Sequence, residues 1–480
     1  MKNQKLSQLN KEDRPVCHLT PETGWLNDPN GFSLYGGKYH LFYQSNPIDT
    51  CWGAPRWGHV VSTDLLHWER LPEAMSPDTD YDRDGCFSGT AIDNGGHMIM
   101  YTGFRLDPDD ERGRGIQTQC MAFGDGLTYR KYEGNPVLTE QELPEDGDPY
   151  EFRDPKLWQE PDGSFRAMLA NHNTREGAQL LLYGSGDGRH WEFRKVLMTN
   201  EGKPGWMWEC PDFFSIRDEK TGMQRQAVLV STMGQVECLC MIGDYDRESE
   251  TFHETAWQTL EQGFDLYAPE TIETPDGRRV LIGWMQNPKT AERRDIDFPI
   301  NGQMSVPREL KLDGDRIRQK PVRELESCRT DEIIYRDVKL GGQKEVKLDG
   351  IEGRTIDMEL SIRPDGTGMY ELFRMRFAGD GEHYTEFTYE PAAGEAVLDR
   401  SRSGPGCTQL VNARTKIRDR SGGLDVRILL DRLSAEIFIN DGEQVMSAVI
   451  YTDRHAEDIT FYVKGTAVMD IAKYRIKENK

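Results

Sequence analysis

The chain repeats one short motif, Ser62-Thr-Asp-Leu-Leu-His-Trp68, as Ser185-Gly-Asp-Gly-Arg-His-Trp191. A related stretch, Gly124-Asp-Gly-Leu-Thr-Tyr129, lies between the two copies, and a degenerate copy follows them. The copies close on aromatic residues at intervals of 61, 62 and 61 residues: Trp68, Tyr129, Trp191 and Phe252. A module of about 60 residues holds four strands with their turns, which is one blade of a β-propeller. Coincidence among common turn residues does not explain four aromatic residues in step.

The apolar runs of the chain are short and have the pattern of strands. Tyr39-His-Leu-Phe-Tyr43 and Val280-Leu-Ile-Gly-Trp284 are bounded by turn-forming residues, and Thr355–Ile362 alternates apolar and polar residues. No amphipathic helix of three turns stands out in the sequence. We therefore expect an all-β chain with a five-bladed β-propeller over residues 1–315, a linker over 316–336 and a C-terminal β-sandwich over 337–480.

The composition limits which kinds of partner the protein is expected to bind and in which cellular compartment it is expected to work. The 480 residues are too many for one ordinary core, and 82 acidic against 59 basic residues give a net charge of −23, which disfavours nucleic acid and membrane surfaces. The sequence has no run of about 18 apolar residues and no apolar signal segment at its start, so we expect a cytoplasmic protein. The nine cysteines form an odd, scattered set without zinc-site spacing, which favours reduced thiols.

Three acidic residues fall at similar positions of three repeats. Asp154 lies 25 residues after Tyr129, and Glu209 lies 18 residues after Trp191. One repeat length before Trp68 falls at about residue 7, and Asp28 lies about 21 residues after that position. The other two repeats place Gly85–Gly89 and Tyr267–Glu270 in the same phase. Since each blade contributes its innermost strand to the central channel, we expect all five segments to face that channel.

Convergent carboxylates in a channel suit the hydrolysis of an acetal. One carboxyl group must be protonated to donate to the leaving oxygen, and another must be ionised to attack the anomeric carbon or to activate water. Arg153 is expected to favour the ionised form of Asp154, and Trp206 and Trp208 are expected to desolvate Glu209 and favour its protonated form. A lone Asp-Pro segment is more often a turn, but that reading does not explain three acids in phase.

At these acids the sequence resembles a known family. Trp25-Leu-Asn-Asp-Pro-Asn-Gly31, Phe152-Arg-Asp-Pro155 and Trp208-Glu-Cys-Pro-Asp212 are similar to the hallmark motifs of glycoside hydrolase family 32, the invertases and fructan hydrolases. Shorter matches are Phe42-Tyr-Gln-Ser-Asn-Pro47, Trp57-Gly-His59, Cys86-Phe-Ser-Gly-Thr-Ala91, Tyr101-Thr-Gly103 and Pro307-Arg-Glu-Leu310. The resemblance spans about residues 18 to 312 and implies a five-bladed propeller with a C-terminal sandwich.

The resemblance also implies roles for individual residues. Asp28 resembles the nucleophile of the family, Glu209 its general acid/base, and Asp154 the residue that stabilises the transition state. The implied reaction is a retaining double displacement, which requires the carboxyl groups of Asp28 and Glu209 about 5 Å apart. The candidate substrate-binding residues are Trp25, Asn27, Gln44, Trp52, Phe87, Ser88, Arg153, Glu270 and Trp284. No metal and no cofactor are implied.

Two departures from the family leave the substrate open. Ser45 stands where relatives commonly carry Tyr, and Glu270 stands where many carry Gln. The expected substrate is sucrose or a short fructo-oligosaccharide. Sucrose 6-phosphate is the first alternative, and it calls for a cationic group such as Arg56 or His59 near the sugar.

Two alternatives belong to other classes of protein. One is an inverting hydrolase of arabinan or xylan, with carboxyl groups roughly 6.5–9.5 Å apart. The other is a non-catalytic fructan-binding propeller whose acids only bind the sugar. The sandwich shows no acidic cluster in channel phase, so its expected role is packing against the propeller or contact between subunits.

Overall fold

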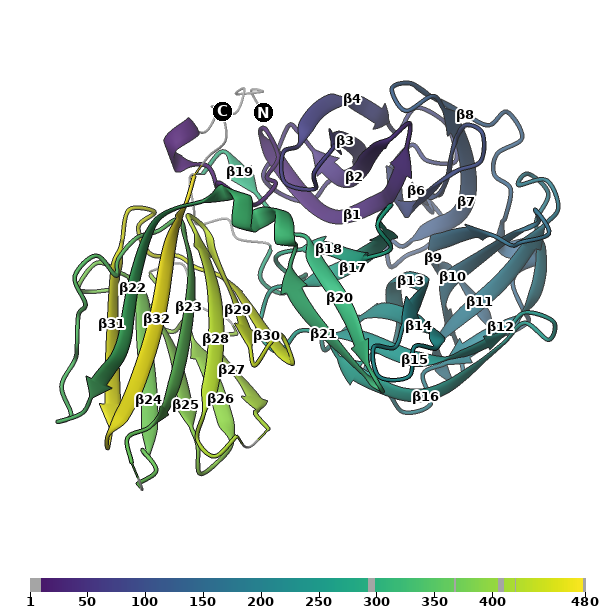
Figure 1. Ribbon diagram of the computed structural model, residues 1–480. Coiled ribbons are helices and arrows are strands. Elements are labelled where there is room, and N and C mark those ends of the chain that lie inside the picture. The colour runs from purple at the N-terminus through teal and green to yellow at the C-terminus, as the bar shows by residue number, and fades with distance from the viewer. Residues whose placement is uncertain (1–9, 292–297, 367, 405–409, 419, 478–480) are drawn as a thin grey trace.

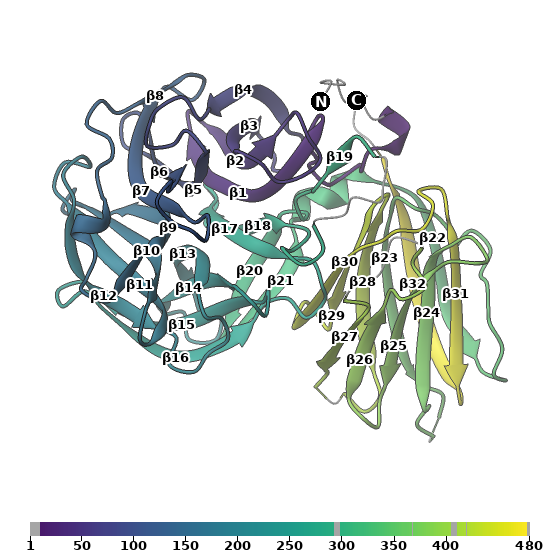
Figure 2. The same ribbon diagram turned by 180° about the vertical axis from the view of Figure 1, so that it is seen from behind.

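The computed structural model describes residues 10–291, 298–366, 368–404, 410–418 and 420–477. They form two β domains that lie side by side (Figure 1). In one domain five small sheets stand around a central axis, and in the other two larger sheets pack face to face, as the view from behind also shows (Figure 2). The prediction of a five-bladed propeller followed by a sandwich is confirmed.

Each blade has four antiparallel strands in chain order, interrupted only in blade 5, where a short strand that pairs with the first blade comes between the second and third strands. Blade 1 contains β1 (Gly24–Tyr35), β2 (Lys38–Asn46), β3 (Arg56–Ser62) and β4 (Glu69–Met75); blade 2 contains β5 (Gly85–Asp93), β6 (His97–Leu106), β7 (Gly115–Gly124) and β8 (Tyr129–Lys131). Blade 3 contains β9 (Gly147–Gln159), β10 (Phe165–Asn173), β11 (Gly177–Ser185) and β12 (Glu192–Thr199); blade 4 contains β13 (Trp208–Arg217), β14 (Gln224–Thr232), β15 (Cys238–Asp246) and β16 (Thr251–Thr259). Blade 5 contains β17 (Tyr267–Glu273), β18 (Arg279–Trp284), β20 (Arg308–Asp313) and β21 (Arg316–Pro321).

The sequence repeat corresponds to the blades. Trp68 and Trp191 immediately precede β4 and β12, Tyr129 opens β8, and Phe252 is the second residue of β16. The repeated aromatic residue therefore marks the start of the outermost strand in each of the first four blades.

The ring closes between the last blade and the first. The short strand β19 (Ile300–Asn301) pairs in parallel with the start of β1, at Gly24 and Trp25. A chain segment from the last blade thus becomes the fifth strand of the first sheet, and it holds β1 at a fixed place around the axis.

The hydrophobic core of the propeller lies between neighbouring blades. Blades 1 and 2 share a buried cluster that includes Phe42, Trp57 and Tyr101, and blades 3 and 4 share one that includes Met168 and Trp208. Similar clusters join blades 2 and 3, blades 4 and 5, and blades 5 and 1. Burial of apolar surface stabilises such contacts by about 25 cal/mol per Å², and it fixes the innermost strands relative to one another.

The second domain is a sandwich of two antiparallel sheets. The six-stranded sheet has the order β22 (Arg329–Leu340), β32 (Ala467–Ile476), β23 (Ile356–Pro364), β28 (Leu424–Asp431), β29 (Ser434–Ile439), β30 (Gln444–Val449). The five-stranded sheet has the order β27 (Asn412–Lys416), β26 (Glu395–Asp399), β25 (Thr385–Glu390), β24 (Leu372–Gly379), β31 (Asp458–Lys464). Their inner faces share one apolar core.

The domain boundary differs from the linker expected at residues 316–336. Residues 316–321 form β21, the outermost strand of blade 5, and β22 of the sandwich already begins at Arg329. The connection is the 3₁₀ helix η3 (Arg323–Cys328), whose Leu325 and Cys328 are buried. The many charges of this stretch suggested a linker, but in strand β21 buried residues alternate with exposed or half-buried ones, and the strand pairs with β20.

Helical structure is scarce in the described part of the chain. It comprises η1 (Lys11–Asp13), η2 (Glu140–Glu142) and η3. Among the described residues, no helix has the length and apolar character needed to cross a membrane. Among the described cysteines, Cys17, Cys86, Cys120, Cys210, Cys238 and Cys240 are thiols without a disulfide, and Cys407 lies outside the described residues.

Candidate active site

The five innermost strands share one local irregularity. In β1, β5, β9, β13 and β17 the pairing with the next strand shifts register part-way along. Three of these irregularities contain a residue other than glycine in the left-handed region: Asp154 at φ +59°, Cys210 at φ +48° and Ala268 at φ +50°. This conformation costs about 1–2 kcal/mol per residue, and a bulge of this kind re-aims the side chains beside it. The acids of three blades thereby come together near the axis.

Asp28 lies in the irregular part of β1 and has neighbours from three blades. Its Oδ2 accepts a hydrogen bond from Ser88 Oγ at 3.1 Å and lies 3.7 Å from Cys210 Sγ. Burial, followed by the charges of Glu209 and Asp154, raises the pKa of Asp28 to about 7. Like charges nearby disfavour the ionised form, so the two other acids act on Asp28 in the same direction as burial.

Asp154 is held by the next blade. Its Oδ2 accepts a hydrogen bond from the backbone N–H of Cys210 at 2.9 Å, and Cys210 Sγ lies 3.6 Å away. Burial raises the pKa of Asp154 to about 6, against the opposing effect of Arg153. Arg153 therefore acts in the expected direction, but burial outweighs it.

Glu209 has two polar partners. Arg153 donates to its Oε1 from Nη2 at 2.9 Å and from Nε at 3.2 Å, and the hydroxyl of Tyr267 donates to Oε2. Arg153 also pairs with Glu151. The carboxylate of Glu209 is thus fixed at both oxygens by side chains from blades 3 and 5.

The two tryptophans near Glu209 do not form the enclosure that the sequence suggested. Trp208 is fully buried between blades, and its Nε1 donates to the carbonyl of Pro204 at 2.9 Å. Trp206 is 47% exposed and lies edge-on to the ring of His172. The direct contacts of the Glu209 carboxylate are therefore a cation and a phenol.

Several aromatic residues lie on or beside the strands that carry the acids and their partners. Trp52 is 49% exposed and stands edge-on to Phe87, which itself stacks on Phe104 at 4.3 Å. Trp25 and Trp284 lie against each other with ring centroids 5.8 Å apart. Such faces suit the C–H surfaces of a sugar ring.

Several polar groups of the site complete this arrangement. Trp25 Nε1 donates to Asn27 Oδ1 at 2.6 Å, and the buried amide of Gln44 lies beside Asn30. Among the described residues, Asp28 Oδ1 and Trp284 Nε1 are buried without a hydrogen-bond partner. Orphaned buried groups are uncommon, so these two atoms keep an unused capacity for hydrogen bonding.

The carboxyl group of Glu270 binds the protein backbone, whereas its candidate role as a substrate-binding residue requires it to face the sugar. Its carboxylate accepts hydrogen bonds from the backbone N–H groups of Phe32 at 2.7 Å and of Gly31 at 3.2 Å. Burial raises its pKa to about 8, against the effect of Lys156. Both oxygens thus join β17 to β1, so the structure gives Glu270 a role in holding two blades together.

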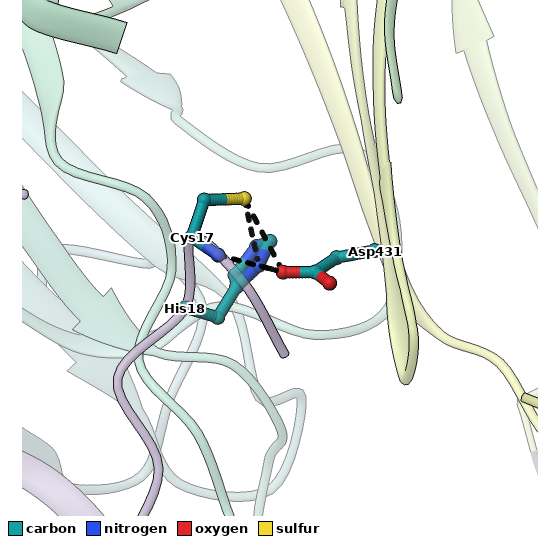
Figure 3. A group of neighbouring side chains, drawn as sticks. All are labelled: Cys17, His18 and Asp431. Carbon is teal, nitrogen blue, oxygen red and sulfur yellow. Dashed lines mark hydrogen bonds and ion pairs between the residues drawn. The ribbon is translucent and has the colours of Figure 1, made fainter. Parts of the chain in front are cut away.

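One group of potential metal ligands is found among the described residues, and it lies at the domain interface. It consists of Cys17, His18 and Asp431 (Figure 3). His18 Nδ1 lies 2.8 Å from Asp431 Oδ2, whereas nitrogen and oxygen ligands of a tetrahedral zinc ion are about 3.3 Å apart. Asp431 Oδ2 also accepts the backbone N–H groups of Val16 and Cys17. The group is therefore already joined by hydrogen bonds, and it takes no part in the candidate active site.

Comparison with known families agrees with this geometry. The chain matches the Glycosyl hydrolases family 32 N-terminal domain over residues 18–321 and the Glycosyl hydrolases family 32 C terminal over residues 324–478. The chain belongs to glycoside hydrolase family 32. Family 32 membership makes it a glycoside hydrolase, and the two matched domains meet at the boundary seen in the structure.

Individual relatives cover nearly the whole chain. A sucrose-6-phosphate hydrolase of Zymomonas mobilis is 34% identical over 97% of this chain and 92% of its own length. A levanase of Bacillus subtilis is 31% identical over 96% of this chain and 70% of its own length. A variant of a Bombyx mori β-fructofuranosidase, solved in complex with sucrose, is 31% identical, with a TM-score of 0.81 over 99% of this chain and 96% of that chain.

Two residues of the site were not recognised as candidates from the sequence. Cys210 touches both Asp28 and Asp154, and Tyr267 binds Glu209. Both lie in segments that the repeat had already placed in channel phase. The repeat identifies the segment, but it does not identify which side chain of an irregular strand turns toward the acids.

Proposed function

We propose that this chain is a retaining β-fructofuranosidase that releases the terminal non-reducing β-D-fructofuranosyl unit of sucrose or of a short fructo-oligosaccharide. The observation that carries the proposal is the meeting of Asp28, Asp154 and Glu209 from three blades. Cys210 Sγ lies against both Asp28 and Asp154, and Arg153 lies 3.7 Å from Asp154 and 2.9 Å from Glu209. A site with adjacent carboxyl groups in different environments is suited to acid/base and nucleophilic roles.

In the first step Asp28 attacks C2 of the fructosyl unit. Glu209, protonated, donates its proton to the glycosidic oxygen, the C2–O bond breaks, and glucose or the shortened sugar leaves. The product is a covalent fructosyl ester of Asp28. Asp154 accepts hydrogen bonds from fructose hydroxyl groups as positive charge develops at the ring.

In the second step Glu209, now ionised, takes a proton from water. The resulting oxygen nucleophile attacks C2, and the ester bond to Asp28 breaks to release fructose with its configuration retained. Arg153 and Tyr267 hold the two oxygens of Glu209 in place for this step.

The surroundings of the two candidate phosphate ligands support a neutral substrate. His59 is buried, its Nε2 lies 3.0 Å from His40 Nδ1, and burial lowers its pKa to about 3. Arg56 pairs with Glu73 at 3.2 Å. These residues are therefore poor candidates for binding a phosphate group.

Sucrose 6-phosphate is the second candidate substrate, because relatives such as the one from Zymomonas mobilis bear the name sucrose-6-phosphate hydrolase. The experiment that separates the two is a comparison of kcat/KM for sucrose and for its 6-phosphate. We expect sucrose to be used at least as well. A preference of about 100-fold for the phosphate, equal to about 2.7 kcal/mol, would reverse this order.

Two further assays separate this proposal from the other classes. Release of β-fructofuranose as the first anomer, followed by NMR, identifies retention, whereas the α-anomer indicates inversion. Binding of a β-fructoside without any release of fructose would identify a sugar-binding protein and end the proposal.

A further inference from the structure

A segment of the propeller runs along the sandwich immediately before it enters the active site. Residues 260–266, here called the bridging segment, connect β16 to β17 and lie against β30. The backbone N–H of Gln262 donates to the carbonyl of Val445 at 2.8 Å, and that of Phe264 donates to the carbonyl of Ser447 at 2.8 Å. In both views β30 is the strand of its sheet that lies toward the propeller (Figures 1 and 2).

The bridging segment is packed into the sandwich as well as hydrogen-bonded to it. Phe264 is 7% exposed and belongs to the sandwich core, whose other buried members lie between Leu340 and Ile471. A Cβ atom on Gly263 would come within 2.3 Å of the backbone nitrogen of Ser447, so only glycine fits this approach. Glu261 accepts hydrogen bonds from Ser447 N at 2.7 Å and from Ser447 Oγ at 2.8 Å.

Asp265 ties the end of this segment to both domains. Its Oδ2 accepts hydrogen bonds from the side chain of Arg400 and from the backbone N–H of Val449 at 2.8 Å, both in the sandwich. Its Oδ1 accepts hydrogen bonds from Thr290 at 3.2 Å and Asn287 at 3.3 Å, both in the propeller. The side chains of Asp265 and Arg400 are fully buried.

Two residues after Asp265 the chain reaches Tyr267. Two residues of extended chain span at most about 7 Å, so the place of Tyr267 depends closely on that of Asp265. Tyr267 is 2% exposed, stands edge-on to Trp284, and donates its hydroxyl to Glu209 Oε2. The neighbouring Ala268 N–H is bound by Ser231 Oγ at 2.8 Å.

We propose that the sandwich domain positions the acid/base carboxyl group of Glu209 through the bridging segment and Tyr267. Asp265, Arg400 and Tyr267 are then positioning residues for the reaction, and the second domain contributes to catalysis indirectly, through the place that it gives Glu209. This inference rests on the proposed role of Glu209. A carboxyl group displaced by even about 1 Å loses much of its effect on the reaction, which can amount to about 100-fold.

The test compares two substrates that differ in their need for an acid. Sucrose has a poor leaving group, whereas 4-nitrophenyl β-D-fructofuranoside has one that needs little protonation. We expect Tyr267→Phe and Asp265→Asn to lower kcat/KM for sucrose by at least about tenfold. The same variants should lower kcat/KM for the aryl fructoside by less than about threefold.

The pH profile gives a second readout of the same defect. A hydrogen bond donated to a carboxylate favours its ionised form. The basic limb of kcat/KM for sucrose is therefore expected at higher pH in Tyr267→Phe than in the parent enzyme. A purely structural defect would lower the whole profile without moving this limb.

Asp431→Asn is the matched control. Asp431 is also a fully buried aspartate at the domain interface and also faces a cation, His18, at 2.8 Å (Figure 3). Its partners Val16, Cys17 and His18 lie before β1 and not on the bridging segment. We expect this variant to lower the melting temperature but to leave the ratio of the two substrates unchanged.

A milder variant covers the case in which Asp265→Asn does not fold. Ser447→Ala removes the hydroxyl contacts with Glu261 and Arg308 and leaves every charge in place. It should change the substrate ratio in the same direction by a smaller factor. Equal loss on both substrates in Tyr267→Phe and Ser447→Ala would overturn the inference. So would the same ratio change in Asp431→Asn.

Glu209→Gln separates a failure of this inference from a failure of the proposed function. If Glu209→Gln slows both substrates equally, Glu209 is not the acid and the proposed function itself fails. If Glu209→Gln is selective for sucrose while the bridging-segment variants are not, only the role of the sandwich is wrong.

Discussion

Asp28 near the propeller axis and Asp431 at the domain interface are both removed from bulk water, yet their pKa values move in opposite directions. Burial and two neighbouring carboxylates raise the pKa of Asp28 to about 7. Burial acts on Asp431 too, but His18 and the backbone N–H groups of Cys17 and Val16 outweigh it and hold its pKa at about 2. The interface matches each acid with a cation or a backbone donor, whereas the active site brings acids together and leaves them partly unmatched.

This difference teaches that buried acids alone do not identify an active site. Glu436 at the interface is paired with both Arg308 and His18, and its pKa, despite burial, is lowered to about 2. Such groups stabilise the fold. The raised pKa values of Asp28 and Asp154 mean that ionising them costs stability, and such a cost is common where a protein carries a catalytic site.

The largest effect is expected from removing the proposed nucleophile, Asp28. Asp28→Asn should lower kcat by about 10⁴-fold or more, because the variant lacks the carboxylate proposed to form the fructosyl ester. Folding raises the pKa of Asp28 to about 7, so the folded protein favours the protonated form of this carboxyl group. The stability that this preference gives is present at low pH and is lost as the pH rises through about 7. Asp28→Asn should therefore raise the melting temperature at pH 8 and not at pH 4. Retention of more than about a tenth of the activity would contradict the role of Asp28.

Removing the acid should give a large but substrate-dependent effect. Glu209→Gln is expected to lower kcat/KM for sucrose by about 10²- to 10⁴-fold, and to affect an aryl fructoside with a good leaving group far less. Steady-state kinetics with both substrates measure the ratio. Equal slowing of both would exclude Glu209 as the proton donor.

A stability effect without a catalytic one is expected at the interface. His18 is fully buried between Asp431 and Glu436. Cys17 Sγ lies 3.4 Å from its Nδ1, and Arg308 pairs with the same Glu436. Burial opposes the charge of His18, but Cys17, Asp431 and Glu436 raise its pKa well above the usual range. His18→Gln should lower the free energy of unfolding by about 3–5 kcal/mol near pH 6.

The stability lost in His18→Gln should depend on pH, because folding raises the pKa of His18. A cation whose pKa is raised by folding contributes stability below its unfolded pKa, near 6.5, and loses that contribution as the pH rises through the folded value. The difference in melting temperature between the parent and His18→Gln should therefore shrink at alkaline pH. A difference that is constant from pH 6 to pH 10 would show that His18 is not charged in the folded protein.

The smallest effect is expected from Ser88, which donates to Asp28 Oδ2 at 3.1 Å. The acid limb of kcat/KM should lie near pH 7, the pKa of Asp28, because the nucleophile must be ionised. Ser88→Ala removes a bond that favours the ionised form and should move this limb up by about 0.5–1 pH unit. An unchanged limb would mean that another group sets it.

The fold was largely predictable because the blade is a local unit. Trp68, Tyr129, Trp191 and Phe252 recur at the blade length, and the three acids lie in the same phase. The exact orientation of side chains was not predictable, since a shift of one residue in a strand turns its side chains to the other face. Glu270 and Tyr267 are three residues apart on one irregular strand, yet one joins two blades and the other binds Glu209.

Long-range contacts were also beyond the sequence. His18 and Asp431 are 413 positions apart, and no local pattern connects them. The boundary near residue 322 was missed for a related reason, because the charged strand β21 is recognised only through its pairing with β20.

The most direct test of the central claim is to trap the fructosyl-enzyme. Glu209→Gln incubated with 4-nitrophenyl β-D-fructofuranoside should form the ester readily and hydrolyse it slowly, because the base of the second step is missing. Mass spectrometry of the quenched, digested protein should then find one added fructosyl unit on the peptide that contains Asp28. An unmodified Asp28 peptide during turnover, or an adduct on the peptide of Asp154, would contradict the mechanism.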